Sequence, residues 1–417
     1  MTLDRSWYAR DARGWTCEAP DDGAAAFHRG LPGYAPTPLV EAPALAAELG
    51  VGRLFVKDES ARFDLRAFKY LGASWAGFRA VAARTGYAGP ASLDRLRAFL
   101  ADSGAADGPG GVGRGGRGGR GGRGGRGGAE IGAGGLALIT ATDGNHGRAV
   151  ARTARLLGLP ARVYVPEGAP DVVLDRISAE GALLTVVDAD YDGAVSAARA
   201  DAEGLGGDAA AGGLLIQDTA WDGYEQVPAW IVAGYETLFA EIDAQLAAAG
   251  VAWFGGGGAG LISVPVGVGS LAQAAVAHYR QVGLPRGRRP LLLSVEPDTA
   301  ACVLRSLAGG ALASVPTAGT VMNGLNCGTP SSIAWPYLRD GLDAAIEVSD
   351  AAAREAVAAL SSAGVAAGPS GAAGLAGLRA TLTGAGAASR RHDLGLDAGE
   401  PAVVVCLSTE GPLDVSR

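Results

Sequence analysis

Two lysines stand out among the residues that could do covalent chemistry. The chain of 417 residues holds 35 lysines and arginines, and only Lys57 and Lys69 are lysine, so 33 of the 35 are arginine. A neutral primary amine can attack a carbonyl carbon and form a Schiff base, whereas arginine stays protonated. Lys57 is followed by Asp58 and Glu59, where an ion pair would keep it charged. Lys69 lies between two aromatic residues that would favour the neutral amine, so we expect imine chemistry there.

The stretch TATDGNHGRAVA, residues 140–151, has the composition of a turn that opens a helix. Gly144 and Gly147 permit a tight turn and a close backbone approach, and the Asn145 amide can donate to a ligand oxygen. Asp143 would lie at the helix N-terminus, where the helix dipole stabilises its carboxylate, and an ordinary N-cap is an equally good interpretation. His146 is more typical of a structural hydrogen bond than of catalysis.

A second glycine-rich turn, PVGVGSLAQA at residues 265–274, also follows an apolar run and precedes a helical stretch. Backbone N–H groups at the start of a helix bind anions. The turn lacks the G-K-[ST] ending of a Walker loop and the complete G-x-G-x-x-G of a dinucleotide site, so it accounts for a single phosphate. The residues that would hold this phosphate are Gly267, Val268, Gly269, Ser270 and Leu271.

Two hydroxyl groups follow the last apolar run, VVVCLSTEG at residues 403–411. Ser408 and Thr409 would lie at the carboxyl edge of a parallel sheet, where α/β folds bind ligands. A Schiff-base lysine, an asparagine-bearing turn, a cradle for one phosphate and a hydroxyl at a strand end together indicate a pyridoxal phosphate site. The pattern leaves open whether Ser408 or Thr409 faces the pyridine nitrogen.

The elements that position these residues can be predicted from the hydrophobic pattern. Apolar runs of strand length alternate with alanine-rich stretches of helical length, which indicates a parallel α/β architecture. Strands are expected at 53–58, 136–140, 162–166, 183–187, 214–218, 261–266, 291–297 and 402–408. The clearest helices are expected at 66–84 and 145–158.

Composition excludes several classes of function. A net charge of −8 and a pI near 5.2 argue against a surface for polyanions over most of the chain. Four widely spaced cysteines indicate reduced thiols, with neither a disulfide framework nor a metal site. The N-terminus lacks the apolar core of a signal peptide, and the uncharged stretch 244–277 is too rich in glycine for a membrane helix. We expect a cytoplasmic protein that does not bind a membrane.

Residues 104–128 differ from the rest of the chain. Arginine recurs there at every third position from 114 to 126, between glycines. With no apolar residue after Val112, the segment cannot bury a face, and we expect a disordered insertion. Nucleic-acid contact is the alternative, but aromatic residues, which usually accompany it, are absent. We therefore do not expect nucleic acid as a partner.

Six stretches carry a resemblance to a known family. AFKYLGASWA, TATDGNHGRAVA, QDTAWDGYEQVP, VEPDTAACVLRS, TVMNGLNCGTPSSIAW and STEG occur in family order between residues 30 and 414. They resemble the diaminopropionate ammonia-lyases, which belong to the tryptophan-synthase-β-like (type II) group of pyridoxal phosphate enzymes. The resemblance implies two open, mostly parallel α/β domains with the cofactor in the cleft between them. It implies a large domain of residues 1–85 and 222–417 and a small domain of 86–221.

The resemblance also implies a role for each candidate residue. Lys69 would carry the cofactor as an imine, Asn145 would bond its phenolic oxygen, and the turn 267–271 would hold its phosphate. Asp143 and Asp218 would act as bases towards the substrate α-carbon. Tyr191 and Ser370 would lie on the substrate side. Pro369 and Pro412 depart from the family pattern there, so the resemblance specifies the cofactor more closely than the exact substrate.

The implied reaction is the α,β-elimination of 2,3-diaminopropionate to pyruvate and two ammonia by a homodimer. The first alternative is another type II enzyme, such as a serine or threonine dehydratase or a β-replacement synthase. The dehydratases have a serine where this chain has Asp143. The second alternative is an inactive protein of this fold that contacts RNA through the Arg-Gly insertion. Retention of Lys69, Asp143 and Asn145 argues against an inactive protein.

Overall fold

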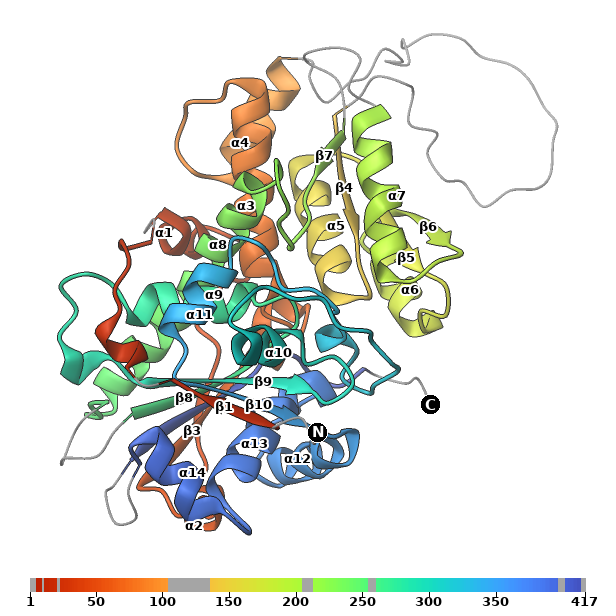
Figure 1. Cartoon of the computed structure of the whole chain (residues 1–417). Coiled ribbons are helices and arrows are strands. Elements are labelled where there is room, and N and C mark those ends of the chain that lie inside the picture. The colour runs from red at the N-terminus through yellow and green to blue at the C-terminus, as the bar shows by residue number, and fades with distance from the viewer. Residues whose placement is uncertain are drawn as a thin grey trace, which may run out of the picture. The chain divides into compact units, whose positions relative to one another are not determined.

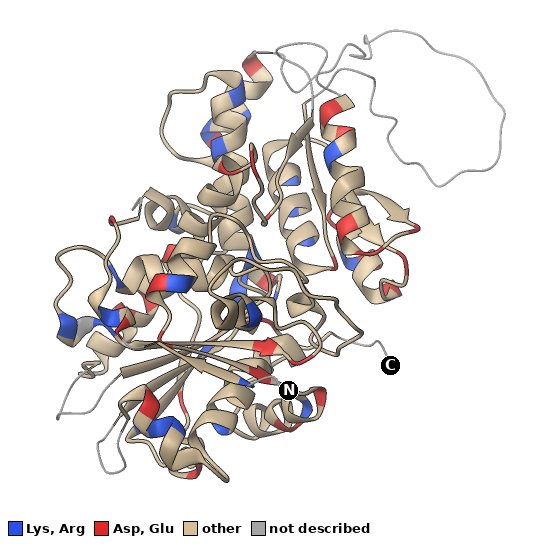
Figure 2. Ribbon diagram, in the orientation of Figure 1, with Lys and Arg blue, Asp and Glu red and all other residues tan. Residues whose placement is uncertain are grey.

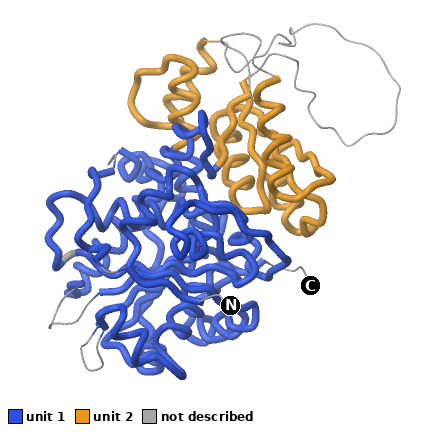
Figure 3. Tube along the Cα trace, viewed as in Figure 1, with its two compact units in different colours: residues 1–75, 218–417 blue, residues 76–217 orange. Residues whose placement is uncertain are grey.

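The computed structural model describes residues 5–9, 11–20, 23–103, 136–204, 213–253, 260–396 and 402–413 of the chain. Two compact units are formed (Figure 3): unit 1 contains residues 1–75 and 218–417, and unit 2 contains residues 76–217. The sequence prediction sets the domain boundaries at 85/86 and 221/222, whereas the units divide inside helix α3 (Lys69–Thr85) and directly before Asp218. The Arg-Gly insertion at 104–128 lies outside the described residues.

Unit 1 is built on a seven-stranded sheet in the order β1-β10-β9-β8-β11-β3-β2. The five central strands are parallel, and the two edge strands pair antiparallel with their neighbours. Every residue of β8, β9, β10 and β11 is buried, as expected for parallel strands covered on both faces. The strands are β1 (Ser6–Tyr8), β2 (Leu39–Glu41), β3 (Arg53–Asp58), β8 (Gly260–Pro265), β9 (Leu291–Pro297), β10 (Ala344–Val348) and β11 (Val403–Ser408).

Helices cover both faces of this sheet (Figure 1). One face carries α2 (Pro43–Leu49), α12 (Asp350–Ser362), α13 (Pro369–Leu382) and α14 (Ala387–Leu394). The other carries α8 (Gln226–Ala248), α9 (Ser270–Tyr279), α10 (Cys302–Gly309) and α11 (Trp335–Gly341), with α1 (Gly23–Arg29) beside α8. A continuous apolar core joins α2, α12, α13 and α14 to the central strands.

Helix α13 approaches the sheet closely because the residues on its inner face are small. A Cβ at Gly377 would lie 2.3 Å from Cγ2 of Val295 on β9, so any larger residue would push the helix outwards. Dense packing of this kind transmits small displacements instead of absorbing them. The start of α13 is therefore held firmly at the carboxyl ends of the central strands.

Unit 2 has a four-stranded parallel sheet in the order β6-β5-β4-β7. Its strands are β4 (Ala137–Ala141), β5 (Ala161–Pro166), β6 (Leu183–Val187) and β7 (Gly213–Leu215). Apolar residues of α7 (Tyr191–Gly204) pack on one side of the sheet and those of α6 (Asp171–Ser178) on the other. Helix α5 (Asn145–Leu157) contacts β4, β5 and both α4 (Leu93–Asp102) and α6.

The parallel α/β architecture predicted from the sequence is confirmed. All eight predicted strands are present, although β7 ends at Leu215, three residues earlier than expected. The prediction missed β10 and both antiparallel edge strands. The edge strands are three residues each, too short for a hydrophobic pattern to develop.

Charged residues of both signs occur on the helices of each unit, and the central strands carry few of them (Figure 2). Among the described residues, no helix combines the length and apolar character that crossing a bilayer requires. Within the same residues, no group of three or more His, Cys, Asp or Glu side chains is arranged to hold a metal ion.

Candidate active site

Lys69, the first residue of α3, forms an ion pair with Asp218. Its Nζ donates a hydrogen bond of 2.5 Å to Oδ2 of Asp218, and the two side chains are 20% and 6% exposed. The same Nζ lies 5.4 Å from the centre of the Phe68 ring. The residue predicted to form the Schiff base and one of the predicted bases are therefore in direct contact.

The charge state of Lys69 differs from the sequence prediction. Burial lowers the pKa of Lys69, but the charge of Asp218, with smaller contributions that include Tyr235, outweighs burial and holds that pKa above its ordinary value. The expectation that aromatic neighbours keep this amine neutral is therefore wrong. The carboxylate that raises this pKa belongs to Asp218, 149 residues away in the chain, so the sequence next to Lys69 does not indicate it.

Lys57 is fully buried, and its ammonium group is already saturated. Its Nζ donates to the backbone oxygen of Thr37 at 2.9 Å, to Oε2 of Glu241 at 2.7 Å and to Oε1 of Gln245 at 2.9 Å. Three donated hydrogen bonds use all three ammonium hydrogens. Lys57 is thus a structural residue, which supports Lys69 as the reactive lysine.

The partner of Lys57 also differs from the sequence prediction. The ion pair forms with Glu241 on α8, not with Asp58 or Glu59. The Asp58 carboxylate accepts from the amide of Ser60, and Glu59 pairs with Arg62. Asp58 follows Lys57 directly in β3 and so points to the opposite face, and Glu59 begins the next turn, so adjacency in sequence does not make a pair.

The glycine-rich turn between β8 and α9 has the geometry of an anion cradle. Gly269 is the N-cap of α9 and has a φ of 97°, a left-handed conformation that glycine adopts readily. The amides of residues 267–271 donate no hydrogen bond to the described chain. Free amides at the start of a helix bind phosphate well. The Ser270 hydroxyl does not donate a hydrogen bond towards this cradle.

Ser270 instead connects the cradle to Asp218. Its Oγ donates a 2.8 Å hydrogen bond to the backbone oxygen of Asp218. Ser331 makes a second connection, since its amide donates to the backbone oxygen of Val268 and its Oγ accepts from the amide of Ala220. The segment that carries Asp218 is thereby fixed to the turn that would hold a phosphate.

The hydroxyl of Ser408 is a buried group without a hydrogen-bond partner among the described residues. Its Oγ is fully buried at the end of β11. A Cβ at Gly371, on the first turn of α13, would lie 3.3 Å from this oxygen. An unpaired buried hydroxyl costs about 1–3 kcal/mol. A ligand atom that pairs with Ser408 would remove this cost, so the geometry favours Ser408 as the partner of a ring nitrogen.

Ser370 lies in the first turn of α13, at the same end of the sheet. Its Oγ is 3.3 Å from the amide of Gly324, which donates to it. Pro369 is the first residue of the helix, a position that proline favours because its missing N–H is not needed there. The departure at Pro369 therefore has a structural reason at the helix start.

In unit 2, the turn that carries Asp143 and Asn145 is organised by a neighbouring threonine. The Oγ1 of Thr142 accepts from the amides of Gly144 and Gly147 at 2.9 and 3.0 Å. The N-cap of α5 is Gly144, so the interpretation of Asp143 as an ordinary N-cap is wrong. Asp143 and Asn145 are half-buried immediately before and at the first turn of α5.

Two further predictions concern unit 2. The Nε2 of His146 is 2.7 Å from the backbone oxygen of Ile216, which confirms a structural role for this histidine. Tyr191 begins α7, and its hydroxyl accepts a 2.7 Å hydrogen bond from Nε2 of Gln217. Gln217 also accepts from Thr140, so Tyr191 is connected to the end of β4.

The structure divides the predicted residues into two groups. Lys69, Asp218, the 267–271 turn, Ser370, Ser408 and Thr409 belong to unit 1. Asp143, Asn145 and Tyr191 belong to unit 2. Within unit 1, contacts and strand ends bring the members to the carboxyl edge of the sheet, where parallel α/β folds bind ligands.

Sequence reasoning missed two residues of unit 1 beside this group. Tyr235 on α8 is fully buried, acts on the pKa of Lys69, and has a hydroxyl without a partner among the described residues. Cys327 also acts on the pKa of Lys69, and its Sγ would lie 3.1 Å from a Cβ at Gly267. Tyr235 lies in the middle of α8, and Cys327 lies in the loop after residues 323–325, so neither occupies a strand end or a helix start of the kind that indicated the other residues.

Comparison with known proteins identifies the family of this chain. A family profile described as "Pyridoxal-phosphate dependent enzyme" matches residues 124–393. The chain belongs to the pyridoxal-phosphate dependent enzyme family. This result confirms the type II fold class expected from the sequence.

Two curated members of this pyridoxal-phosphate dependent family are similar over most of the chain. Diaminopropionate ammonia-lyase of Salmonella typhimurium is 34% identical over 328 residues, covering 78% of this chain and 71% of the relative. Diaminopropionate ammonia-lyase of Escherichia coli K12 is 31% identical over 401 residues, covering 94% and 89%. A crystal structure of the Escherichia coli enzyme with an aminoacrylate-PLP azomethine reaction intermediate matches with a TM-score of 0.77, at 29% identity and coverage of 98% and 94%.

The residues of unit 1 fit the cofactor of the pyridoxal-phosphate dependent family. Lys69 supplies a primary amine for an imine, and the five amides of the 267–271 turn can donate hydrogen bonds to a phosphate. The orphaned hydroxyl of Ser408 can pair with a pyridine nitrogen. The 267–271 amides and the Ser408 hydroxyl make no hydrogen bond among the described residues. The Lys69 ammonium pairs with a single carboxylate, that of Asp218.

Proposed function

We propose that this protein is a diaminopropionate ammonia-lyase, which converts 2,3-diaminopropionate and water to pyruvate and two ammonia with pyridoxal phosphate. The observation that carries the proposal is the Lys69–Asp218 ion pair beside a turn whose backbone amides can hold a phosphate. It is supported by two relatives that bear this name over most of the chain.

The cofactor, when bound, withdraws electrons from the substrate α-carbon. Lys69 holds the cofactor until the substrate amine replaces it, and Asp218 is placed to take a proton. The amides of residues 267–271 hold the phosphate, and the hydrogen bond from Ser270 keeps the Asp218 backbone in place. Loss of the α-proton and of the β-amino group, followed by hydrolysis, yields pyruvate and the second ammonia.

The neutral hydroxyl of Ser408 suits elimination. A hydroxyl cannot hold a pyridine nitrogen protonated as a carboxylate would, so less electron density is drawn into the ring. This favours expulsion of a β-substituent over transamination. The crystal structure of the Escherichia coli relative with an aminoacrylate-PLP intermediate is consistent with elimination in that enzyme.

Three residues of unit 2 complete the proposal by resemblance. We assign Asn145 to the phenolic oxygen of the cofactor, Asp143 to a second base and Tyr191 to the substrate side. The Thr142 hydroxyl, which holds two amides of the same turn, supports this by making the turn rigid. Thr142→Ala would loosen the turn while leaving Asp143 and Asn145 in the chain.

A panel of substrates tests the proposal against its nearest alternative, a dehydratase or β-replacement synthase. The purified protein is supplied with pyridoxal phosphate and assayed for keto acid with 2,3-diaminopropionate, serine, threonine and cysteine. The proposal predicts the highest kcat/KM for diaminopropionate. A higher value for serine or threonine would identify a dehydratase. A carboxylate at position 143, where dehydratases have serine, is the feature that favours the ammonia-lyase.

The remaining assignments concern assembly and location. By resemblance we assign a cytoplasmic homodimer, and the four cysteines, all unpaired in the structure, support a reducing compartment. Light scattering of the purified protein would test the dimer, since a mass near 41.5 kDa would mean a monomer.

A further inference from the structure

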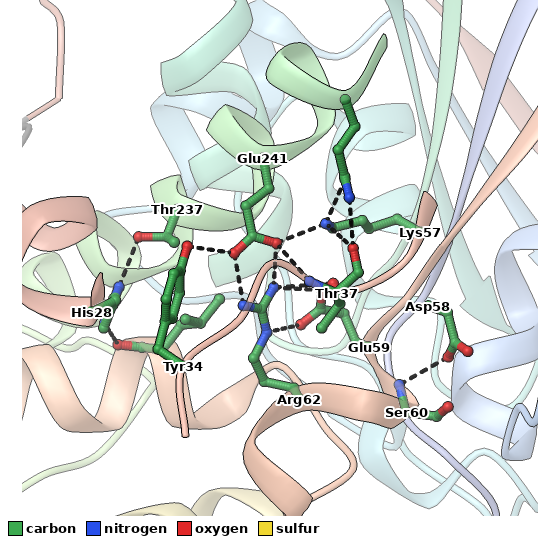
Figure 4. Close-up of polar contacts among 12 residues, drawn as sticks. His28, Tyr34, Thr37, Lys57, Asp58, Glu59, Ser60, Arg62, Thr237 and Glu241 are labelled. Carbon is green, nitrogen blue, oxygen red and sulfur yellow. Dashed lines mark hydrogen bonds and ion pairs between the residues drawn. The ribbon is translucent and has the colours of Figure 1, made fainter. Parts of the chain in front are cut away.

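Arg62 is the centre of a buried ionic network close in sequence to Lys69 (Figure 4). Its guanidinium donates two hydrogen bonds of 2.8 Å to Glu59 and bonds of 2.7 and 2.8 Å to the two oxygens of Glu241. Lys57 donates to Glu241, and Thr37 donates to Glu59 at 2.6 Å. We refer to these five residues as the Arg62 network.

The Arg62 network joins segments that are remote in the chain. Glu241 comes from α8, Lys57 and Glu59 from the end of β3 and the following turn, and Thr37 from the segment before β2. All five residues are buried. Bidentate pairing of a guanidinium with carboxylates fixes orientation as well as distance. Arg62 is therefore held in one position relative to α8.

The backbone directly after Arg62 is strained. Phe63, Asp64 and Arg66 have φ values of 48°, 57° and 62°, and they are the only non-glycine residues with positive φ in the described chain. The backbone oxygen of Arg62 accepts from the amides of both Leu65 and Arg66. Left-handed residues other than glycine persist only where the surrounding structure forces them.

The other end of this turn is fastened to the strand end that carries Ser408 and Thr409. The amide of Gly411 donates to the backbone oxygen of Arg66 at 2.8 Å, and the amide of Phe68 donates to that of Thr409 at 3.2 Å. Lys69 follows at once. The strained turn is thus held between the Arg62 network and the end of β11, and it determines where α3 begins.

We propose that the Arg62–Glu241 ion pair is a positioning device for Lys69. It holds Phe63, Asp64 and Arg66 in their left-handed conformation and so sets the place of the Lys69 amine against Asp218 and the cofactor. Arg62 and Glu241 are positioning residues, since neither touches the reacting atoms. This inference rests on the proposed function, because it assumes that Lys69 binds the cofactor.

The step that depends on this placement is imine formation. The Lys69 ammonium gives up a proton, its Nζ bonds to the aldehyde carbon, and the aldehyde oxygen leaves as water. The reaction requires the nitrogen to approach one carbon along one direction, so a displacement of about 1 Å can slow it about 100-fold. Binding of the phosphate and ring to the 267–271 turn and Ser408 does not require the Lys69 nitrogen at all.

Two ligands distinguish imine formation from non-covalent binding in the apoprotein. Pyridoxal phosphate forms the imine, which is followed by its absorption band. Pyridoxine 5′-phosphate has a hydroxymethyl group in place of the aldehyde, and it reports only non-covalent binding by fluorescence titration. For Glu241→Gln we expect imine formation at least about tenfold slower, with the affinity for pyridoxine 5′-phosphate unchanged.

Variants at Asp64, whose side chain is exposed, act on the turn without touching the Arg62 network. Asp64→Val should slow imine formation, because a β-branched residue disfavours positive φ. Asp64→Gly should restore part of the rate to Glu241→Gln, because glycine adopts positive φ freely. If Glu241→Gln does not fold, Asp64→Val alone tests the proposal.

The matched control is Asp343→Asn, which removes a buried carboxylate from another ion pair of unit 1. Asp343 pairs with Arg280 at 2.6 Å, and the two side chains are 9% and 0% exposed. The proposal predicts wild-type imine formation in this variant. It is overturned if Asp343→Asn is as slow as Glu241→Gln, if both ligands weaken in parallel, or if Asp64→Gly rescues nothing. Failure of the wild-type protein to form any imine would instead refute the proposed function.

Discussion

Lys69 and Asp218 are 149 residues apart in the chain, and their side chains meet at 2.5 Å. Under the proposed function, this pair would hold the reactive lysine before the cofactor binds. A buried ammonium without a partner would be costly, and Asp218 stabilises it. Under the same proposal, this carboxylate would then accept a proton.

We expect Lys69→Ala and Lys69→Arg to lose the imine absorption band and nearly all turnover, because neither side chain can form a Schiff base. Borohydride reduction of the wild-type protein, followed by peptide mass spectrometry, should locate the cofactor on Lys69. The chain has only one other lysine. Reduced cofactor on Lys57 would contradict the assignment and the structural role given to Lys57.

We expect Asp218 and Asp143 to remove the α-proton from different isomers of the substrate. The L and D forms of diaminopropionate present their α-protons on opposite faces of a planar cofactor complex, so each needs its own base. Asp218→Asn should lower L-isomer turnover by about 10²–10⁴-fold and spare the D-isomer, and Asp143→Asn should do the reverse. The measurement is kcat for each isomer. Equal losses for both isomers in each variant would mean that neither acid is the specific base.

Ser408→Ala should have opposite effects on stability and on cofactor binding. The buried Oγ has no partner, so its removal should leave the free energy of unfolding of the apoprotein unchanged or raise it by about 1 kcal/mol. The affinity for pyridoxine 5′-phosphate should fall, because the ring nitrogen loses its partner. Thr409→Val is the control. A larger loss of affinity in Thr409→Val would assign the pyridine nitrogen to Thr409.

The stability of the protein should fall between about pH 6.5 and 9 because of His278. Burial lowers the pKa of His278, but hydrogen bonds and charges of Asp243 and Glu236 outweigh burial and raise that pKa to about 9. A pKa raised in the folded state adds stability that is fully present below the unfolded pKa of about 6.5 and is lost as the pH rises through 9.

The expected loss is on the order of 1–3 kcal/mol in the free energy of unfolding, measured by urea denaturation at several pH values. His278→Gln should remove the part of this slope that His278 contributes, whereas the part below pH 8 that comes from Glu296, whose pKa burial raises to about 8, should persist. His28 does not interfere, because burial lowers its pKa to about 3, and its contribution changes only below pH 6.5. An identical slope in His278→Gln would assign the effect to other groups.

Deletion of residues 110–128 should leave turnover nearly unchanged, because we expect a glycine-rich segment whose one apolar residue is Val112 to contribute little packing. RNA binding at physiological ionic strength is not expected. The check is an activity assay of the deletion variant beside a filter-binding assay of the full chain. Micromolar RNA affinity that disappears with the deletion would support the nucleic-acid alternative.

The sequence was sufficient for what depends on local pattern. The continuous apolar runs predicted every buried central strand except β10, whose sequence AAIEV begins with two alanines and is less apolar than its neighbours. The turns at 140–151 and 265–274 were predicted because glycine at a helix start has a direct physical meaning. Lys69 was predicted because lysine is rare in this chain.

The sequence was insufficient where the outcome depends on distant side chains. The charge state of Lys69 depends on Asp218, and the partner of Lys57 is Glu241, 184 residues away. The preference for Ser408 depends on the packed core, which buries its hydroxyl without a partner among the described residues. The strained turn at 63–66 contains no glycine that would indicate positive φ from the sequence. The surrounding contacts impose its conformation.

The most direct test of the proposed function is the ratio of products from 2,3-diaminopropionate. Ammonia and pyruvate are measured together during turnover by the wild-type protein with pyridoxal phosphate, and Lys69→Ala serves as the blank. The proposed elimination predicts two ammonia for each pyruvate, because both nitrogens of the substrate are released. A ratio of one, or no pyruvate while serine or threonine is converted, would contradict the assignment as a diaminopropionate ammonia-lyase.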